Sequence, residues 1–251
     1  ASFALSDDLL GNKTVGNTLV LTLQSQIQQA AATALGNHKG AVVALDPTTG
    51  AVLAMVTSPT YDPTPLASHD NNTIVDAWKQ LQADPDQPML NRAINSTFPP
   101  GSTFKVVTTA AALEHGFTTS TSYAPASSFL PGQTNQAIQN FGGETCGGNM
   151  VQAFTVSCNA YYAKLGTQLP QGALAQTAAD FGFGSAPPLG IPAAVSKIGT
   201  PEELNSPAFT AQSAIGQYND AASPLQMALV ASAVADGGKI MKPYLVQEER
   251  D

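Results

Sequence analysis

The sequence has few charged residues and still fewer basic ones. Charged side chains make up 11% of its 251 residues, with 10 Lys and Arg against 18 Asp and Glu, and they form no basic run. Proteins whose main task is to bind a nucleic-acid backbone or an anionic membrane need clustered Lys and Arg. The net charge of −8 therefore argues against both functions and against a nucleic-acid partner.

Histidine and cysteine are also scarce. The histidines His38, His69 and His115 do not have the spacing of a metal motif such as H-E-x-x-H, so we expect neither a metal site nor a cofactor. The two cysteines, Cys146 and Cys158, form no C-x-x-C motif. One such pair fits either a reducing or an oxidising compartment.

Long hydrophobic runs and several enzyme signatures are missing too. The longest apolar stretch, 227–235, is too short to cross a bilayer, and no signal segment opens the sequence. No Gly-x-Ser-x-Gly elbow occurs, which excludes the α/β-hydrolase form of serine chemistry. The glycine-rich run 142–148 lacks the Lys-Ser/Thr end of a phosphate-binding loop.

Hydrophobic periodicity predicts a mixed fold of strands and helices. Residues 17–23 alternate as a strand does, and 24–35 carry apolar residues at helical spacing. Two β-rich runs, 40–45 and 51–56, flank the turn residues 46–50, which predicts a hairpin. Because both runs are apolar on both faces, we expect a sheet that is covered by helices.

The segments that follow the hairpin vary more in composition. Residues 58–87 are rich in Pro, Asp and Asn, which predicts a loop broken by one short helix at about 74–82, with Trp78 packed there. The Gly-rich run 142–148 has the composition of a mobile loop, and 173–182 reads as a helix.

The stretch 98–114 contains a candidate nucleophile. Two prolines and a glycine precede apolar residues at helical spacing, so a helix should begin near Ser102. Residues i and i+3 share a helix face, which brings the Lys105 amine near the Ser102 hydroxyl. A lysine can take the serine proton only if burial or a nearby cation lowers its pKa. A sequence of this composition should contain about 0.6 S-x-x-K match by chance, so the spacing alone does not establish catalysis. The alternative is that Ser102 only caps the helix and that Lys105 is solvated.

The context of this pair resembles a known family. Residues 99–105 read Pro-Pro-Gly-Ser-Thr-Phe-Lys and are similar to a segment of the penicillin-binding proteins, whose signature is S-x-x-K, then S-x-N, then K-T-G. The segment 151–165 contains Ser-Cys-Asn at 157–159 and resembles the family's S-x-N segment. Residues 213–238 resemble its I-G-Q-G, T-P-L-Q-M-A and N-G-G-x motifs, with Tyr218 in place of the usual glycine.

The resemblance extends over about 18–246 and best fits the class B penicillin-binding proteins, the monofunctional peptidoglycan transpeptidases. It implies an α/β (α+β) fold like that of the serine β-lactamases, with an antiparallel sheet covered by helices and a helical subdomain. It also implies acylation by D-Ala-D-Ala stem peptides, stalling by β-lactams and an extracytoplasmic location behind an N-terminal membrane anchor. Other cell-division or cell-wall synthesis proteins are further implied partners.

The same resemblance assigns roles to four side chains. They are the nucleophile Ser102, the base Lys105, the proton relay Ser157 and Asn159, whose amide holds the substrate's peptide carbonyl. The implied extracytoplasmic location favours a disulfide between Cys146 and Cys158, because disulfides persist in oxidising compartments. The alternative is that Cys158 is a buried apolar thiol.

We expect residues 1–251 to form a single transpeptidase domain. Its N-terminal sheet and helix part would occupy 1–57, and a mainly helical part with both serine motifs would occupy 102–236. The K-T-G motif does not occur before the sequence stops at Asp251. We therefore expect the domain to lack its last strands and this chain alone to be inactive or impaired.

Two other kinds of function remain open. A serine β-lactamase or a D,D-carboxypeptidase would use the same nucleophile, but the class A deacylation pattern E-x-x-L-N fails at 201–205 because Pro201 occupies its first position. A non-catalytic sensor or scaffold would keep the fold and only bind β-lactam or cell-wall peptide.

Overall fold

The structure is a computed structural model that describes residues 16–250, so 1–15 of the expected N-terminal part lie outside the described residues. The α-helices are α2 (Ser25–Leu35), α3 (Asn71–Ala83), α4 (Arg92–Asn95), α5 (Lys105–Glu114), α6 (Met150–Thr155), α7 (Asn159–Gln168), α8 (Ala173–Asp180), α9 (Pro207–Ser213) and α10 (Pro224–Ala235). The strands are β1 (Thr18–Leu21), β2 (Gly40–Leu45), β3 (Val52–Ser58), β4 (Ser122–Ala126), β5 (Ser128–Phe129), β6 (Ile138–Gln139), β7 (Cys146–Asn149) and β8 (Val246–Arg250). Short 3₁₀ turns are η1 (Thr64–Ala67), η2 (Gly101–Phe104), η3 (Phe141–Gly143) and η4 (Glu203–Asn205).

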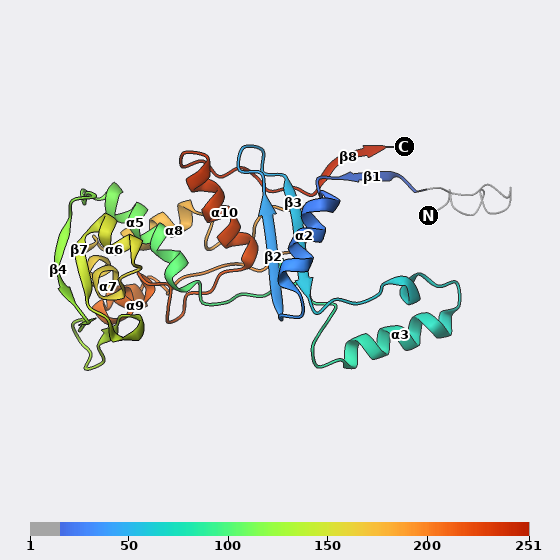
Figure 1. Ribbon diagram of the computed structural model, residues 1–251. Helices are drawn as coiled ribbons and strands as arrows, with labels where there is room; N and C mark the ends of the chain where they lie inside the picture. The colour runs from blue at the N-terminus through green and yellow to red at the C-terminus, as the bar shows by residue number, and fades with distance from the viewer. Residues whose placement is uncertain (1–15, 251) are drawn as a thin grey trace.

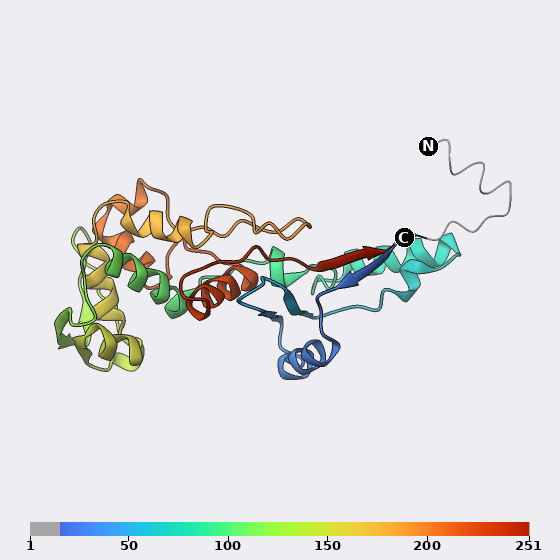
Figure 2. The ribbon, with the colours of Figure 1, turned by 90° about the horizontal axis from the view of Figure 1, so that it is seen from above.

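Three parts follow one another along an elongated molecule (Figures 1 and 2). Helices α5 to α9 gather at one end, the β2–β3 hairpin lies in the middle between α2 and α10, and α3 lies in an arm at the other end. Among the helices of residues 16–250, none has the length and apolarity that crossing a membrane requires.

The hairpin is built as the sequence predicts. β2 and β3 pair antiparallel, with Val42 opposite Val56. Alternate residues of β2 point to opposite faces. On one face, Val42 and Ala44 pack against residues of α2. On the other face, Val43 packs in the cluster that contains Leu225 and Leu229 of α10. Helices therefore cover both faces of the pair, which confirms the expected arrangement.

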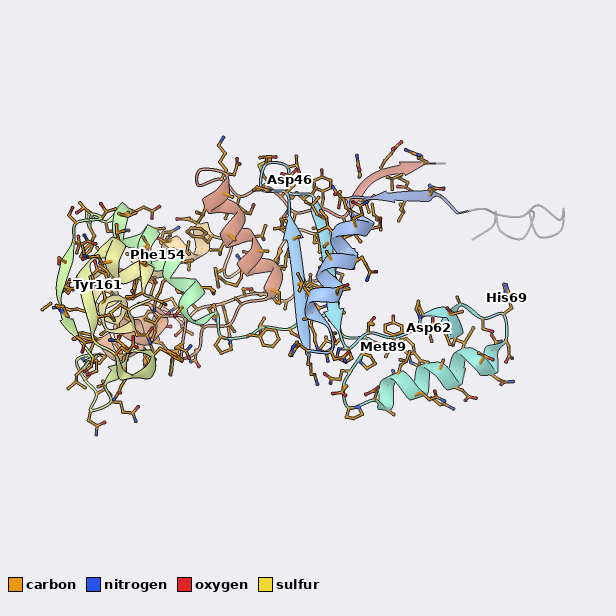
Figure 3. The ribbon with its side chains drawn as sticks, in the orientation of Figure 1. Asp46, Asp62, His69, Met89, Phe154 and Tyr161 are labelled. Atoms are coloured by element: carbon orange, nitrogen blue, oxygen red, sulfur yellow. A yellow bond between two sulfur atoms is a disulfide. The ribbon has the colours of Figure 1, made fainter. Side chains whose placement is uncertain are left out.

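Helix α5 lies between two hydrophobic clusters of the helical part. Phe104, Val107 and Ala111 belong to one cluster, and Ala112 belongs to the other, which is centred on Tyr161 and its neighbours (Figure 3). The expected helix start near Ser102 is a 3₁₀ turn, η2, that runs directly into α5. The residues that follow this turn are thus held from two sides by packed side chains.

Part of the glycine-rich run is a strand and not the expected loop. β7 pairs antiparallel with β4, with Gly148 opposite Tyr123. A Cβ at Gly147 would lie 2.8 Å from the Cα of Pro125, closer than real Cβ atoms approach. Glycine is needed here because two backbones approach closely, a requirement that composition alone does not distinguish from mobility.

The arm runs from the end of β3 to the start of α4 and contains α3. Its helix begins earlier than expected because the Asp70 side chain accepts hydrogen bonds from the N–H groups of Asn72 and Thr73. Figure 3 places His69 near the tip of the arm and Met89 near its base. No residue of α3 is buried, and Trp78 is 48% exposed, so the expected packing of Trp78 is only partial.

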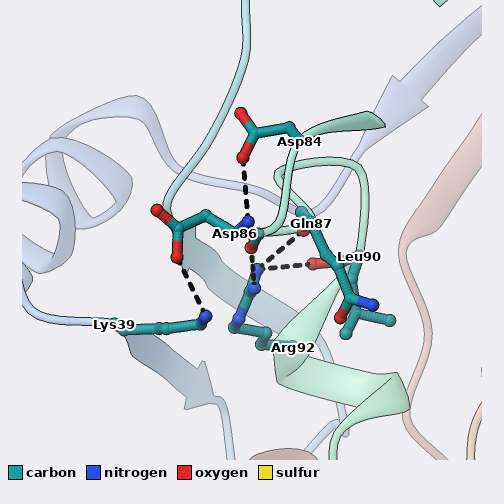
Figure 4. A network of polar contacts seen from close by, with 6 residues as sticks. All are labelled: Lys39, Asp84, Asp86, Gln87, Leu90 and Arg92. Atoms are coloured by element: carbon teal, nitrogen blue, oxygen red, sulfur yellow. Dashed lines mark hydrogen bonds and ion pairs between the residues drawn. The ribbon is translucent and has the colours of Figure 1, made fainter. Parts of the chain in front are cut away.

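The base of the arm is closed by one buried arginine (Figure 4). Arg92 is 3% exposed, and its guanidinium donates hydrogen bonds to the carbonyls of Gln87 (3.1 Å), Leu90 (3.4 Å) and Asp86. The Asp86 side chain pairs instead with Lys39, at 3.1 Å, and both of those side chains are exposed. The cation therefore stabilises the loop through backbone carbonyls and not through a carboxylate.

Replacing Arg92 by Met should destabilise the protein much more than breaking the neighbouring surface ion pair. Arg92→Met leaves three part-buried loop carbonyls without their donor, so we expect the free energy of unfolding to fall by about 2–3 kcal/mol. Lys39→Ala, the matched control, should cost under about 1 kcal/mol because exposed ion pairs contribute little. Urea unfolding of both variants measures the difference, and equal losses would contradict this account of the arm's base.

Candidate active site

The side chains of the S-x-x-K and S-x-N motifs meet at one amine. The Nζ of Lys105 lies 3.1 Å from the Oγ of Ser102, 3.0 Å from the Oγ of Ser157 and 2.6 Å from the Oδ1 of Asn159. It also lies 2.7 Å from the backbone carbonyl oxygen of Ser157. The structure thus brings together all four residues that the sequence singled out, although 52 positions separate Lys105 from Ser157.

Local backbone geometry places these groups. Ser102 and Lys105 lie one turn apart where η2 passes into α5, as the i, i+3 spacing requires. Asn159 is the first residue of α7. Ser157, just before it, has a φ of 55°, a left-handed conformation that is uncommon for a residue with a Cβ. This conformation accompanies the approach of both the hydroxyl and the carbonyl of Ser157 to the same amine.

Burial controls the charge of Lys105. The residue is 1% exposed, and burial lowers its pKa from the ordinary 10.5 to about 8. Within residues 16–250 no carboxylate forms a salt bridge with it. The centre of the Tyr162 ring lies 5.6 Å from Nζ, and its attraction for the ammonium form is weaker than the opposing effect of burial. The amine is therefore far easier to deprotonate than an exposed lysine.

The hydrogen-bond partners fit a neutral amine. A neutral amine has two N–H donors and one lone pair, and two of the four neighbouring atoms, the carbonyl of Ser157 and the Oδ1 of Asn159, can only accept. The Asn159 amide is oriented by its Nδ2, which donates to the Gln139 carbonyl at 3.0 Å. With both N–H groups used, the lone pair of Lys105 is available to a proton from Ser102 or Ser157.

A disulfide joins the strand β7 to the start of α7. Cys146 and Cys158 are bonded, with Cα atoms 5.8 Å apart, so the two cysteines are as close as expected. Cys158 is the middle residue of the S-x-N motif, and it is 1% exposed. The cross-link therefore fixes the backbone between Ser157 and Asn159 to the neighbouring sheet.

Sequence reasoning missed Asn140, which supports the same turn. Its Oδ1 accepts a hydrogen bond from the N–H of Ala160 at 2.8 Å. Its Nδ2 donates to the carbonyls of Ala126 at 2.8 Å and Glu144 at 2.7 Å. The residue is 7% exposed, so it links α7 to the end of β4 and to the residue that follows η3. No spacing or motif marks Asn140, because it lies in a polar stretch that resembles an ordinary loop.

The reactivity of Ser102 should rise with pH through the pKa of Lys105. Only the neutral amine can accept the serine proton, and a pKa of about 8 leaves roughly a tenth of it neutral at pH 7. We expect labelling of Ser102 by a small fluorophosphonate to accelerate nearly tenfold per pH unit below the pKa and to level off above about pH 8. Rates measured by mass spectrometry from pH 6 to 9 test this, with Ser102→Ala as the unlabelled control. A flat profile would exclude Lys105 as the base.

Comparisons with known proteins agree with this geometry. Residues 40–251 match the family model described as the penicillin binding protein transpeptidase domain. The peptidoglycan D,D-transpeptidase PbpA of Mycolicibacterium smegmatis is 41% identical over 97% of this chain and 51% of its own length. The peptidoglycan D,D-transpeptidase MrdA of Acinetobacter baumannii is 31% identical over 95% of this chain and 37% of its own length. The chain thus spans about half the length of the mycobacterial relative and a smaller share of the relative from A. baumannii.

Solved structures show the same fold. The penicillin G acyl-enzyme complex of penicillin-binding protein A from M. tuberculosis superposes with a TM-score of 0.90 and 39% identity, covering 98% of this chain and 58% of that one. A chain of a peptidoglycan synthase complex that coordinates polymerization and crosslinking has a TM-score of 0.83 and 31% identity, covering 94% of this chain and 44% of that one. These matches confirm both the expected fold and the resemblance to the penicillin-binding proteins. The chain belongs to the penicillin-binding protein transpeptidase family.

Proposed function

We propose that this chain carries the nucleophile and base of the D,D-transpeptidase activity that cross-links peptidoglycan stem peptides through a serine acyl-enzyme, and that full turnover also needs the K-T-G motif that does not occur in this sequence. The observation that carries the proposal is the buried amine of Lys105, which lies 3.1 Å from the hydroxyl of Ser102 and has a pKa lowered to about 8. Such an amine can activate a serine without a histidine. The names of the relatives, peptidoglycan D,D-transpeptidases, support the choice of substrate.

Acylation begins when the Ser102 oxygen attacks the carbonyl carbon between the two D-Ala residues of a stem peptide. Its proton moves to the neutral Lys105 amine as the C–O bond forms. The C–N bond then breaks, the terminal D-Ala leaves with a proton delivered through the Ser157 hydroxyl, and an ester on Ser102 remains. The 3.0 Å separation of Ser157 from Lys105 supports this route for the proton.

In the second half of the reaction, an amine from a neighbouring stem peptide attacks the ester. An amide bond forms, the ester C–O bond breaks, and the proton of the attacking amine returns through Lys105 to the Ser102 oxygen. The Asn159 amide holds the donor peptide's carbonyl. Only one N–H of its Nδ2 is used by the Gln139 carbonyl, which leaves the other for substrate. β-Lactams imitate the donor and remain on Ser102.

Hydrolysis, the reaction of a β-lactamase, receives no support from a specific contact. A deacylating carboxylate would need to reach the acyl-serine directly or through one water. Among the described residues, the hydrogen bonds of Lys105 include no carboxylate partner. Glu203, in the segment that nearly matches the deacylation pattern, uses its carboxylate on Thr200 and Asn219. The names of the relatives, peptidoglycan D,D-transpeptidases, favour transfer to an amine over transfer to water.

The proposed place of action is the extracytoplasmic face of the cell membrane, because the polymer that is cross-linked lies outside the cytoplasm. The bond between Cys146 and Cys158 supports this location, since disulfides persist in oxidising compartments. The proposed partners are D-Ala-D-Ala stem peptides, β-lactam antibiotics and other proteins of cell-wall synthesis. Similarity to a chain from a peptidoglycan synthase complex supports the last of these.

Penicillin should form one stable adduct, and it should form on Ser102. We expect intact-mass spectrometry to show a single added penicillin that persists for hours, and Ser102→Ala to show none. Lys105→Ala should abolish the adduct, because no base remains to take the serine proton. Lys164→Ala is the matched control: this lysine lies over the ring of Tyr123, 4.5 Å from its centre, and its loss should leave acylation unchanged.

The other functions give different results in the same experiment. Rapid loss of the adduct would contradict the transpeptidase proposal in favour of a β-lactamase. Absence of any adduct on the folded protein would favour a non-catalytic scaffold. An adduct that survives Ser102→Ala would show that the nucleophile has been misassigned.

A further inference from the structure

Asp220 is a buried carboxylate that the proposed reaction does not use. The residue is 2% exposed, and its Oδ1 accepts a hydrogen bond from the N–H of Gly199 at 3.1 Å. The hydroxyl of Ser213 lies 2.9 Å from both carboxylate oxygens. Within residues 16–250 it has no salt-bridge partner. A buried acid without a cation is costly, so its retention calls for a structural or functional reason.

The contact with Ser213 closes a loop. Ser213 ends α9, and Asp220 follows seven residues later, so their hydrogen bonds join the two ends of the segment 213–220. The same segment is fixed to α5, because the carbonyl of Ala214 accepts a buried hydrogen bond from the Thr108 hydroxyl at 2.8 Å. Asp220 therefore holds a loop whose other contacts lead toward the helix of the nucleophile.

The closed loop touches the turn that carries Ser102. The carbonyl of Gly216 accepts a hydrogen bond from the N–H of Gly101 at 2.8 Å. Gly216 has a φ of 70°, and a Cβ there would collide with the backbone of Gly101, so the two backbones are in direct contact. Just beyond Asp220, Ala222 pairs with Phe98 through two backbone hydrogen bonds of 2.8 and 2.9 Å. The loop thus contacts the turn of Ser102 at Gly101, and the chain just after the loop pairs with Phe98, a few residues earlier.

A third segment completes the junction around Asp220. Ala221 exchanges two backbone hydrogen bonds of 2.8 Å with Lys197, two residues before the Gly199 that donates to the carboxylate. The chain at 221–222 is therefore paired on both sides, to Lys197 and to Phe98. Asp220 lies where these segments meet the end of α9.

We infer that Asp220 is a positioning residue: by holding the loop 213–220 against Gly101, it fixes the turn from which Ser102 presents its hydroxyl to Lys105. The inference rests on the proposed role of Ser102 as the nucleophile. Asp220 would support the proposed reaction without touching the substrate or the reacting atoms.

The charge of the carboxylate guides the choice of variants. The pKa of Asp220 is raised to about 7, chiefly by burial and to a smaller extent by the nearby carboxylate of Glu203, although the hydrogen bonds from Ser213 and Gly199 act in the opposite direction. Asparagine has the same shape as the protonated acid. Its oxygen can accept from Gly199 while its amide donates to the Ser213 oxygen. Asp220→Asn should therefore keep the loop closed, and Asp220→Ala should open it.

The test combines a structural and a chemical measurement on the full chain. In Asp220→Ala we expect hydrogen exchange of the Gly101 amide to accelerate about tenfold or more, because its bond to Gly216 is no longer held. Labelling of Ser102 by a small fluorophosphonate should slow by about tenfold or more. The loss should appear in the first-order rate at saturating probe and not in the probe concentration that gives half of that rate. Asp220→Asn should stay within about threefold of the parent protein in both measurements.

Thr177→Ala separates positioning from general destabilisation. Thr177 is about as buried as Asp220, and its hydroxyl donates to Glu114 at 3.0 Å, so its removal also costs a hydrogen bond, here a part-buried one. It should leave both Gly101 exchange and Ser102 labelling unchanged. If Asp220→Ala does not fold, Ser213→Ala removes the hydroxyl partner alone and should change both measurements in the same direction.

Each outcome decides the inference. Parent-like exchange and labelling in Asp220→Ala, equal losses in Thr177→Ala, or failure of asparagine to restore labelling would overturn it. Absence of labelling in the parent protein would refute the proposed function instead. In that case the exchange of the Gly101 amide still decides whether Asp220 holds the turn.

Discussion

The burial of one amine that has no carboxylate partner among residues 16–250 is the constraint on which the rest of the site depends. An ammonium that is removed from water is strongly disfavoured unless an anion compensates for it, so the neutral form of Lys105 gains relative weight. A neutral amine still needs two acceptors for its N–H groups. The carbonyl of Ser157 and the amide oxygen of Asn159 are those acceptors. Their placement explains why the turn between α6 and α7 must be held so firmly.

Several separate devices hold that turn. The bond between Cys146 and Cys158 attaches it to β7, and the side chain of Asn140 attaches it to the end of β4 and to Glu144, which follows η3. On the opposite side, α5 lies between two hydrophobic clusters, which fixes the position of Lys105 itself. The site is therefore assembled from covalent, polar and apolar contacts that approach the amine from different directions. Each contact limits a different movement of Ser102, Lys105 and Ser157 relative to one another.

The parts of this structure that the sequence could predict are those governed by local periodicity. The hairpin follows from two apolar runs around a turn, and the approach of Ser102 to Lys105 follows from helix geometry. The meeting of Lys105 with Ser157 could be expected only through the family resemblance, because no local rule joins residues so far apart. Asn140, Asp220 and the left-handed backbone of Ser157 escaped prediction for a related reason. Each is defined by partners from distant segments, and a polar or glycine-rich stretch looks the same whether it is packed or solvated.

The arm that contains α3 has a consequence for how this chain could be altered. Its helix buries no residue, and its base is closed locally by Arg92 through three carbonyls of the same segment. A segment of this kind is a natural place for insertion or deletion, since a change in its length disturbs few contacts of the body. The tip near His69 (Figure 3) lies at the other end of the molecule from α5 (Figure 1), the helix that begins at Lys105, and is thus a suitable position for a fused reporter or an affinity handle. Such a fusion would leave the surroundings of the buried amine as they are.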